Sequence, residues 1–274
     1  MDRSSLSRWL YHRLFIGSLL AICFFGFCWW ALHLPPSLAP VVGLLVTCLV
    51  GGCALWEANR LIPEAVRPPT VMLSATSLLL WVGVTWQFAE LALLGSVLLS
   101  LGWLASRLRR DVLAWGGFLI PFVWVALPFA AALYMWNSGA DGIAWVLSSV
   151  ICVKGADSAA YVGGLTLGRH ALAPQWSPRK TWEGLGAALV GGALLGWLTY
   201  GLYIGLPTLW ALGVGLGLAL VGALGDLLES GIKRAANVKD SGRWGTIGGA
   251  LDISDALLLA WPVLMVARPY LQSF

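Results

Sequence analysis

Residues 224–255 hold the densest group of charged side chains in a chain that otherwise contains few of them. Five carboxylates and four cationic side chains fall within this stretch, although only 11% of the 274 residues are charged. They are Asp226, Glu229, Asp240, Asp252 and Asp255, together with Lys233, Arg234, Lys239 and Arg243. Carboxylate oxygens suit a bound Mg²⁺ ion, and the neighbouring cations suit a phosphorylated substrate.

Four of the acidic residues form two pairs with the same spacing. Asp226 and Glu229 are three residues apart, as are Asp252 and Asp255, so each pair shares one face of a helix. The second pair begins an apolar segment, where the helix macrodipole favours negative charge. Two such pairs could supply four oxygen ligands, and the lack of His or Cys at suitable spacing favours Mg²⁺ over zinc. The alternative is that these side chains are helix caps and surface ion pairs.

Two further polar groups precede this stretch. Lys154 and Asp157 stand three residues apart inside an apolar segment, where they either neutralise each other or add Asp157 to the polar centre. Residues 177–184 read Ser-Pro-Arg-Lys-Thr-Trp-Glu-Gly, and cations and hydroxyls just before a helix could hold phosphates. Membrane topology explains Arg179 and Lys180 almost as well.

The elements that carry these residues are predicted to be membrane-spanning helices. Hydrophobic residues make up 59% of the chain, and apolar runs of about 18 to 22 residues recur along it. Backbone amides in lipid need partners within their own segment, and the alternation typical of a barrel strand does not occur. The sequence therefore predicts an all-α, polytopic membrane protein with about nine transmembrane helices. The predicted spans are residues 13–32, 38–58, 69–86, 88–106, 113–136, 142–164, 184–204, 207–228 and 252–270.

The distribution of Lys and Arg orients the predicted helices. A cytoplasmic N-terminus places 15 of the 17 Lys and Arg residues in cytoplasmic segments, in agreement with the positive-inside rule. Only Lys154, inside a span, and Arg268, at the opposite face, lie elsewhere. The two long connections, residues 165–183 and 229–251, are then both cytoplasmic and lie beside the charged stretch.

The side chains capable of chemistry lie almost wholly in the second half of the chain. We therefore predict an N-terminal transmembrane scaffold, residues 1–140, and a C-terminal catalytic region, residues 141–274, with its site facing the cytoplasm. The net charge of +4 reflects topology, because no basic run is interleaved with aromatic residues as a single-strand groove would require. Nucleic acid is therefore not expected as a partner.

Several motifs in the second half are similar to those of one enzyme family. They are Asp157-Ser158-Ala159-Ala160-Tyr161, Gly168-Arg169-His170, Ser177-Pro178-Arg179-Lys180-Thr181-Trp182-Glu183-Gly184, Leu224-Gly225-Asp226-Leu227-Leu228-Glu229-Ser230, Lys233-Arg234 and Lys239-Asp240-Ser241-Gly242. In this respect the chain resembles the phosphatidate cytidylyltransferases, or CDP-diacylglycerol synthases. The resemblance covers residues 150–260, and only Trp56-Glu57-Ala58 is a weak match in the first 140 residues.

Enzymes of this family transfer CMP from CTP to phosphatidic acid, which gives CDP-diacylglycerol and pyrophosphate in phospholipid biosynthesis. The resemblance implies a Mg²⁺-dependent enzyme of the bacterial inner membrane, with Asp226, Asp252 and Asp255 at the metal. It implies that Lys180 and Lys233 act with them as catalytic residues that handle phosphates. The implied substrate-binding residues are Ser177, Arg179, Thr181, Glu183, Arg234, Lys239, Asp240 and Asp157.

The chain departs from the family's pattern between residues 243 and 253. Where the family has Pro-Gly-His-Gly-Gly followed by Leu-Asp-Arg-x-Asp, this sequence is one residue shorter and lacks the proline. Ile247 replaces the histidine and Ile253 replaces the arginine, while both aspartates remain. Loss of a cation near pyrophosphate would weaken electrostatic stabilisation of the transition state.

Two other functions are compatible with the sequence. One is a related membrane transferase that acts on an isoprenoid alcohol or its phosphate. The other is a cation-coupled transporter with the aspartate cluster as its ion site, although the charges lie at one membrane face and no inverted repeat is found. The sequence leaves open the acyl-chain preference, the choice between CTP and dCTP, a second cation and a homodimer.

Overall fold

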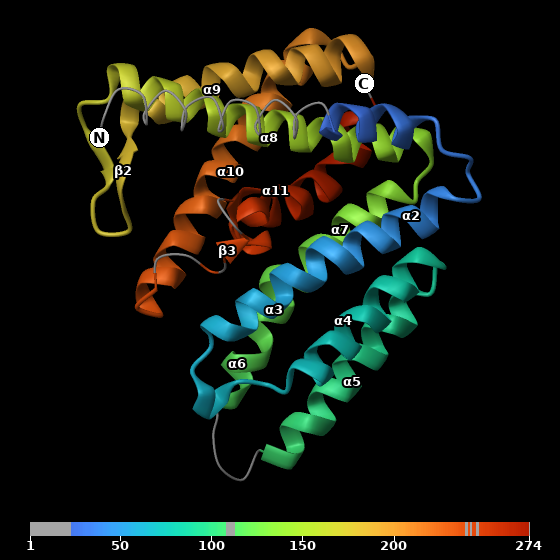
Figure 1. Cartoon of the computed structure of the whole chain (residues 1–274). Helices are drawn as coiled ribbons and strands as arrows, with labels where there is room; N and C mark the ends of the chain where they lie inside the picture. Colours follow the sequence, from blue (N-terminus) through green and yellow to red (C-terminus); the bar gives the residue numbers. More distant parts are fainter. Residues whose placement is uncertain (1–22, 108–112, 239–240, 242, 245–246, 274) are drawn as a thin grey trace, which may run out of the picture.

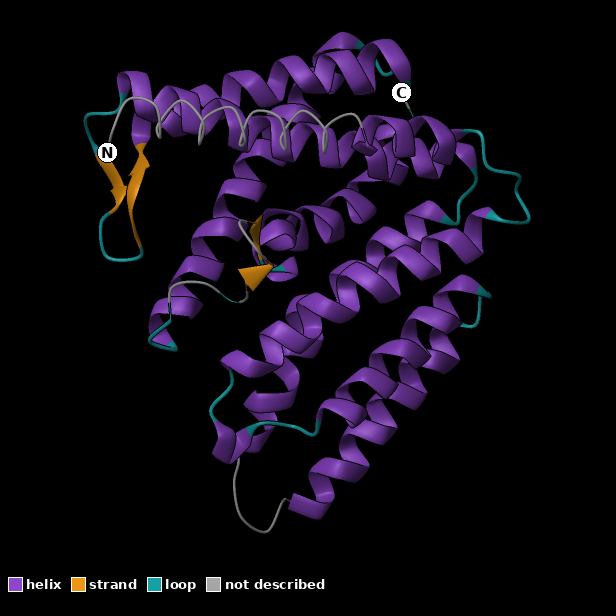
Figure 2. Cartoon of the chain, viewed as in Figure 1, coloured by secondary structure: helices purple, strands orange, loops and turns teal. Residues whose placement is uncertain are grey.

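The computed structural model describes residues 23–107, 113–238, 241, 243–244 and 247–273, which are almost entirely helical (Figures 1 and 2). The predicted substrate contacts Lys239 and Asp240 therefore lie outside the described residues. The first half contains α2 (Ala39–Val46), η1 (Thr47–Gly51), α3 (Gly52–Leu61), η2 (Glu64–Val66), α4 (Thr70–Thr85), α5 (Ala89–Arg107), α6 (Leu113–Pro121), η3 (Phe122–Ala126) and α7 (Leu127–Trp136). The second half contains α8 (Ala140–Leu167), β1 (Ala171–Ala173), β2 (Ser177–Thr181), α9 (Trp182–Gly196), η4 (Trp197–Tyr203), α10 (Thr208–Ala235), β3 (Arg243–Trp244), β4 (Ile247–Gly248) and α11 (Ala250–Leu271).

Six helices of the described chain are long and apolar enough to cross a membrane. They are Ala39–Leu61, Gly116–Trp136, Ala140–Leu167, Trp182–Tyr203, Thr208–Ala235 and Ala250–Leu271. Three shorter apolar helices lie where the other three predicted spans fall, at Cys23–Leu32, Thr70–Thr85 and Ala89–Leu101. The all-α, polytopic membrane class is therefore supported, while the count of nine spans and the cytoplasmic N-terminus stay predictions.

Helix α11 joins the two halves of the chain. It packs against α10 and α8 of the second half and against α7 and α3 of the first, so its N-terminal turn is surrounded by elements of both (Figure 1). Within the second half, α9 packs closely on both α8 and α10. A Cβ added at Gly215 of α10 would collide with the backbone of α9 at Gly192 and Gly196, so only glycine permits this approach.

The two predicted cytoplasmic loops contain more regular structure than the sequence indicated. In the 165–183 connection, β1 and β2 form an antiparallel hairpin that pairs Ala171 with Thr181. In the 229–251 connection, α10 continues through Ala235, so the first part of this segment is helical. Glu229 is buried in this part of α10 and pairs with Lys233 one turn later. The polar residues therefore lie within the helix and do not end it. A second small hairpin, β3–β4, precedes α11.

The contact between α9 and α10 gives a first test of the fold. We expect Gly215→Val to lower the free energy of unfolding by about 1–3 kcal/mol, because the new side chain overpacks the interface. Gly217→Val on the same helix is the matched control, since an added Cβ there meets no atom within 4 Å. Unfolding of both variants in detergent measures the difference, and equal stability of the two would contradict the close approach.

Candidate active site

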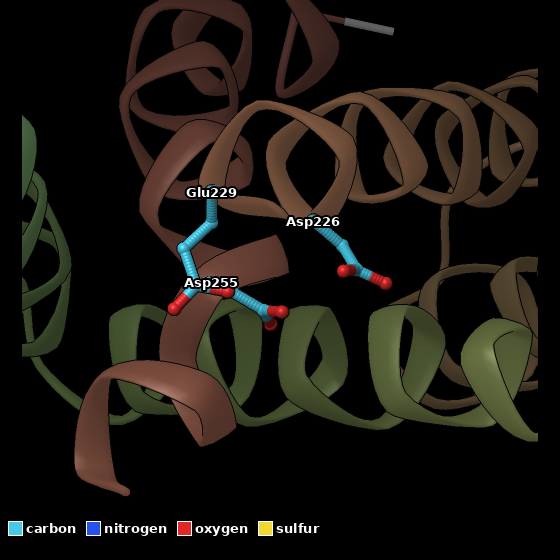
Figure 3. Close-up of side chains that lie close together, drawn as sticks. All are labelled: Asp226, Glu229 and Asp255. Carbon is cyan, nitrogen blue, oxygen red and sulfur yellow. The ribbon is translucent and has the colours of Figure 1, made fainter. Parts of the chain in front are cut away.

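Three carboxylates from two helices form a compact acidic cluster. Asp226 and Glu229 lie on consecutive turns of α10, and Asp255 reaches them from the first turns of α11 (Figure 3). One oxygen atom of each carboxylate lies within 4.8 Å of those of the other two. Glu229 is 1% exposed and Asp255 is 7% exposed, so the cluster is largely withdrawn from solvent. Such a set of hard oxygen donors fits a divalent cation such as Mg²⁺.

One oxygen of the cluster lacks a partner. Oε1 of Glu229 is buried and forms no hydrogen bond with any residue that the structure describes. A buried carboxylate oxygen is costly to leave unpaired, which makes this atom available to a ligand that approaches the cluster.

Three lysine side chains neutralise the carboxylates in the site. Lys180 of β2 pairs with Asp226 at 2.5 Å. Lys233 of α10 lies 2.7 Å from Glu229 and 2.8 Å from Asp252. The third lysine, Lys154 of α8, bridges two further carboxylates at 3.3 and 3.4 Å.

The formal charge of this group is negative. Its five carboxylates are Asp157, Asp226, Glu229, Asp252 and Asp255, and its three ammonium groups are those of Lys154, Lys180 and Lys233. The balance of −2 equals the charge that one divalent cation would neutralise. Buried charges of one sign are costly without compensation, so the described side chains alone leave this site short of positive charge.

The structure places Asp252 differently from the other two carboxylates assigned to the metal by resemblance. Asp226 and Asp255 gather with Glu229, whereas Asp252 accepts hydrogen bonds on both of its oxygens. Its Oδ1 accepts from Lys233 and from the Ser241 hydroxyl at 2.9 Å, and its Oδ2 accepts from the Gly249 backbone at 3.0 Å. Asp252 is therefore connected to the cluster through Lys233, which also pairs with Glu229. Its position at the start of α11 directs its carboxylate toward the preceding loop.

The β1–β2 hairpin borders a cavity of about 600 Å³ beside Asp226, which we call the polar cavity for the charged residues in its wall, although most of its lining is apolar. Arg179, Lys180 and Thr181 of β2 line this cavity together with Asp157 of α8 and Asp226 of α10. Two cationic side chains therefore face a space that also contains carboxylates of the site. This arrangement suits an anionic ligand held with a metal ion.

The remaining predicted substrate-binding residues that the structure describes support the walls of this cavity. Glu183 binds the base of the hairpin, since it accepts from the backbone of Arg169 at 3.1 Å and from His170 Nδ1 at 2.6 Å. Ser177 begins β2 opposite Ala173. The Arg234 guanidinium donates to the backbone carbonyl of Trp176 at the hairpin tip, at 3.3 Å. These contacts tie the hairpin to α9 and α10.

A second, apolar cavity of about 670 Å³ reaches the cluster from another side. It lies between α3, α6, η3 and α10, and Glu229 is its acidic lining residue. Leu119, Ile120 and Val123 also line it, and their side chains are exposed on the protein surface. Apolar side chains exposed on a membrane helix face lipid, so this cavity is accessible to an acyl chain.

Glu57, to which no role was assigned from the sequence, belongs to the surroundings of the site. This α3 carboxylate is 0% exposed and accepts hydrogen bonds from the backbone N–H groups of Ala250 at 3.1 Å and Leu251 at 2.8 Å. Ser241 adds a contact at 3.3 Å, and a Cβ at Gly249 would collide with the same carboxylate. Glu57 thus fixes the N-terminus of α11. An acidic residue inside an apolar span was the signal that could have revealed it.

Comparison with known proteins assigns the chain to a family. The model of the cytidylyltransferase family matches residues 12–271. The chain belongs to this family. It is 31% identical to the phosphatidate cytidylyltransferase of Chlamydia pneumoniae over 180 residues. This aligned region covers 59% of this chain and 58% of that protein. It is 37% identical over 150 residues to that of Mycobacterium bovis, covering 52% and 48%. Family membership therefore agrees with the resemblance found in the sequence motifs, while the chain spans only about half the length of these relatives.

The anchoring of α11 by Glu57 can be tested directly. We expect Glu57→Ala to lower the free energy of unfolding by about 2 kcal/mol or more, because charge-assisted hydrogen bonds to backbone N–H groups are lost. Hydrogen exchange should show faster exchange at the amides of Ala250 and Leu251. Glu64→Ala removes an exposed carboxylate nearby and is the matched control. Unchanged protection of both amides in Glu57→Ala would show that Glu57 does not hold the helix.

Proposed function

We propose that the protein is a phosphatidate cytidylyltransferase, which transfers CMP from CTP to phosphatidic acid and releases pyrophosphate. One observation carries this proposal: α10 contributes Asp226 to the cavity lined by Arg179 and Lys180, and Glu229, three residues later, to the apolar cavity. A nucleotide triphosphate fits the first environment, and a lipid phosphate with acyl chains fits the second. The relatives named phosphatidate cytidylyltransferase support the same reaction.

The proposed reaction is an in-line displacement at the α-phosphorus of CTP. A phosphatidate oxygen forms the new P–O bond, the bond between the α-phosphorus and its bridging oxygen breaks, and the electron pair leaves with pyrophosphate. A phosphate monoester is already largely ionised near neutral pH, so no strong general base is needed. Catalysis then depends on positioning and on neutralisation of phosphate charge.

The lysines of the site are suited to neutralising phosphate charge. Each already pairs with a carboxylate, and a bound phosphate can replace that carboxylate as the lysine's partner. Lys180 and Arg179 face the polar cavity, and Lys233 lies between Glu229 and Asp252. When Lys180 and Lys233 turn to the phosphates of CTP, the carboxylates they leave regain uncompensated charge. Nucleotide and divalent cation are therefore expected to bind cooperatively.

We propose Mg²⁺ as that cation, held by Asp226 and Asp255 with Glu229 as a third carboxylate. Asp252, which the resemblance assigns to the metal, becomes available when Lys233 moves to phosphate. Bound there, Mg²⁺ would supply electrostatic stabilisation of charge on the transferring and leaving phosphates. Asp157 and Thr181 line the same polar cavity and are proposed substrate contacts, whereas Ser177, Glu183 and Arg234 shape the hairpin over it.

The proposed site lies at one membrane face. The C-terminal end of α8 and the N-terminal end of α9 adjoin the β1–β2 hairpin, which also contacts α10, while α11 begins beside β3 (Figure 1). We propose that this face is cytoplasmic and that the membrane is the inner membrane of a bacterium, in accordance with the clustering of Lys and Arg. The catalytic region is then residues 141–274, completed by Glu57 of the scaffold.

The proposal is tested by the transfer reaction itself. Purified protein in detergent should convert phosphatidic acid and labelled CTP into labelled CDP-diacylglycerol with Mg²⁺, and chelation of the metal should abolish the product. We expect Asp255→Asn to lower kcat at least about 100-fold, because loss of a metal carboxylate removes charge stabilisation in the transition state.

Asp141→Asn is the matched control, because this exposed carboxylate lies at the opposite end of α8 and should leave the rate unchanged. Full activity of Asp255→Asn would refute the metal assignment. Transfer to an isoprenoid phosphate but not to phosphatidic acid would refute the proposed lipid substrate.

A further inference from the structure

Lys154 occupies an unusual position for a cation. It lies near the middle of α8, one of the apolar helices long enough to cross the membrane. Its Nζ atom is 3.3 Å from Oδ2 of Asp157 and 3.4 Å from Oδ1 of Asp255. A charged side chain within an apolar span is costly, so such residues mark functional sites more often than structural ones.

A purely structural role would be satisfied by Asp157 alone. That residue stands one turn away on the same helix and already forms an ion pair with Lys154. The second contact reaches across to α11 and to Asp255, a member of the acidic cluster whose side chain is 10% exposed. Lys154 therefore reduces the negative charge on one side of the cluster.

The other two lysines of the site differ from Lys154 in their surroundings. Lys180 lines the polar cavity, and Lys233 lies near the end of α10 beside the loop that precedes α11. Lys154 lines neither of the two cavities described above. Its ammonium group lies between a carboxylate of its own helix, Asp157, and a carboxylate of the acidic cluster, Asp255. On α11, Ile253 provides no cation between the two aspartates, so the positive charge beside Asp255 comes from α8.

We propose that Lys154 is a built-in cation of the site. Its ammonium group occupies the side of the cluster between Asp157 and Asp255, so this side takes no metal ion. A single divalent cation then binds on the other side, at Asp226, Glu229 and Asp255. Lys154 is thus a positioning residue that determines where and how many metal ions bind. Its effect on catalysis depends on the function proposed above, whereas its effect on metal binding does not.

Replacement of the ammonium group tests the proposal on metal binding alone. Mn²⁺ is titrated into the purified full-length protein without CTP or lipid, and bound metal is followed by electron paramagnetic resonance. We expect one Mn²⁺ ion per wild-type chain. Lys154→Met should bind Mn²⁺ at least about tenfold more tightly or take up a second ion, because a positive charge within a few ångströms of the carboxylates has been removed.

The same variant should lose transfer activity at saturating Mg²⁺, by at least about tenfold, because a misplaced or additional metal ion disturbs the arrangement of the phosphates. Tighter metal binding together with slower transfer is the expected signature, since simple structural damage would weaken both. Lys154→Arg keeps the charge and should resemble the wild type in Mn²⁺ binding. Ser158→Ala is the matched control, because this exposed hydroxyl donates to the Lys154 backbone carbonyl one turn away and does not change the charge of the site.

The outcomes separate this proposal from the function. Unchanged or weaker Mn²⁺ binding by Lys154→Met, or no Mn²⁺ binding by the wild type, overturns the role of Lys154 even if CTP transfer is observed. Tighter binding in a protein that shows no transfer supports Lys154 and overturns the proposed function instead. If thermal unfolding shows that Lys154→Met is not folded, Lys154→Gln keeps the polarity without the charge and is subject to the same criteria.

Discussion

The need to neutralise carboxylates inside an apolar helix bundle determines the arrangement of this protein. Isolated charges in such surroundings would be prohibitively costly, so each acidic residue of the site lies against a cation or a helix N-terminus. Lys154 of α8 and Lys233 of α10 pair with carboxylates of α11, and Lys180 pairs the β1–β2 hairpin with Asp226 of α10. The electrostatic requirement of the site is therefore also a set of tertiary contacts, and the chemistry and the fold depend on the same ion pairs.

These ion pairs explain how the site can remain folded although its carboxylates outnumber its lysines. The hairpin lysine lines the polar cavity, the α10 lysine pairs with Glu229 and Asp252, and the α8 lysine pairs with Asp157 and Asp255. Each of the three cations is therefore held by carboxylates of the site. A site of this kind can remain folded without its ligands and still acquire strong affinity for a phosphate and a metal ion together.

The sequence allowed much of this arrangement to be predicted, because strong local patterns carry it. The three-residue spacing of Asp226 and Glu229 placed both on one face of a helix, and long apolar runs located the six helices that can cross a membrane. The extension of α10 was missed because a polar run resembles a loop until its partners are known. The gathering of Glu229 rather than Asp252 with Asp226 and Asp255, and the role of Glu57, depend on contacts between distant segments that no local pattern encodes.

The bond between Glu57 and α11 joins the surroundings of the acidic cluster to a helix that is long and apolar enough to cross a membrane. Glu57 belongs to this helix, Ala39–Leu61, and tilting is one way in which a spanning helix adapts to the thickness of the hydrocarbon layer. Any change of that tilt moves the carboxylate that holds the first backbone amides of α11, and with them the aspartates one turn later. A change in bilayer thickness that tilts this helix would therefore reach the geometry of the acidic cluster through a single carboxylate.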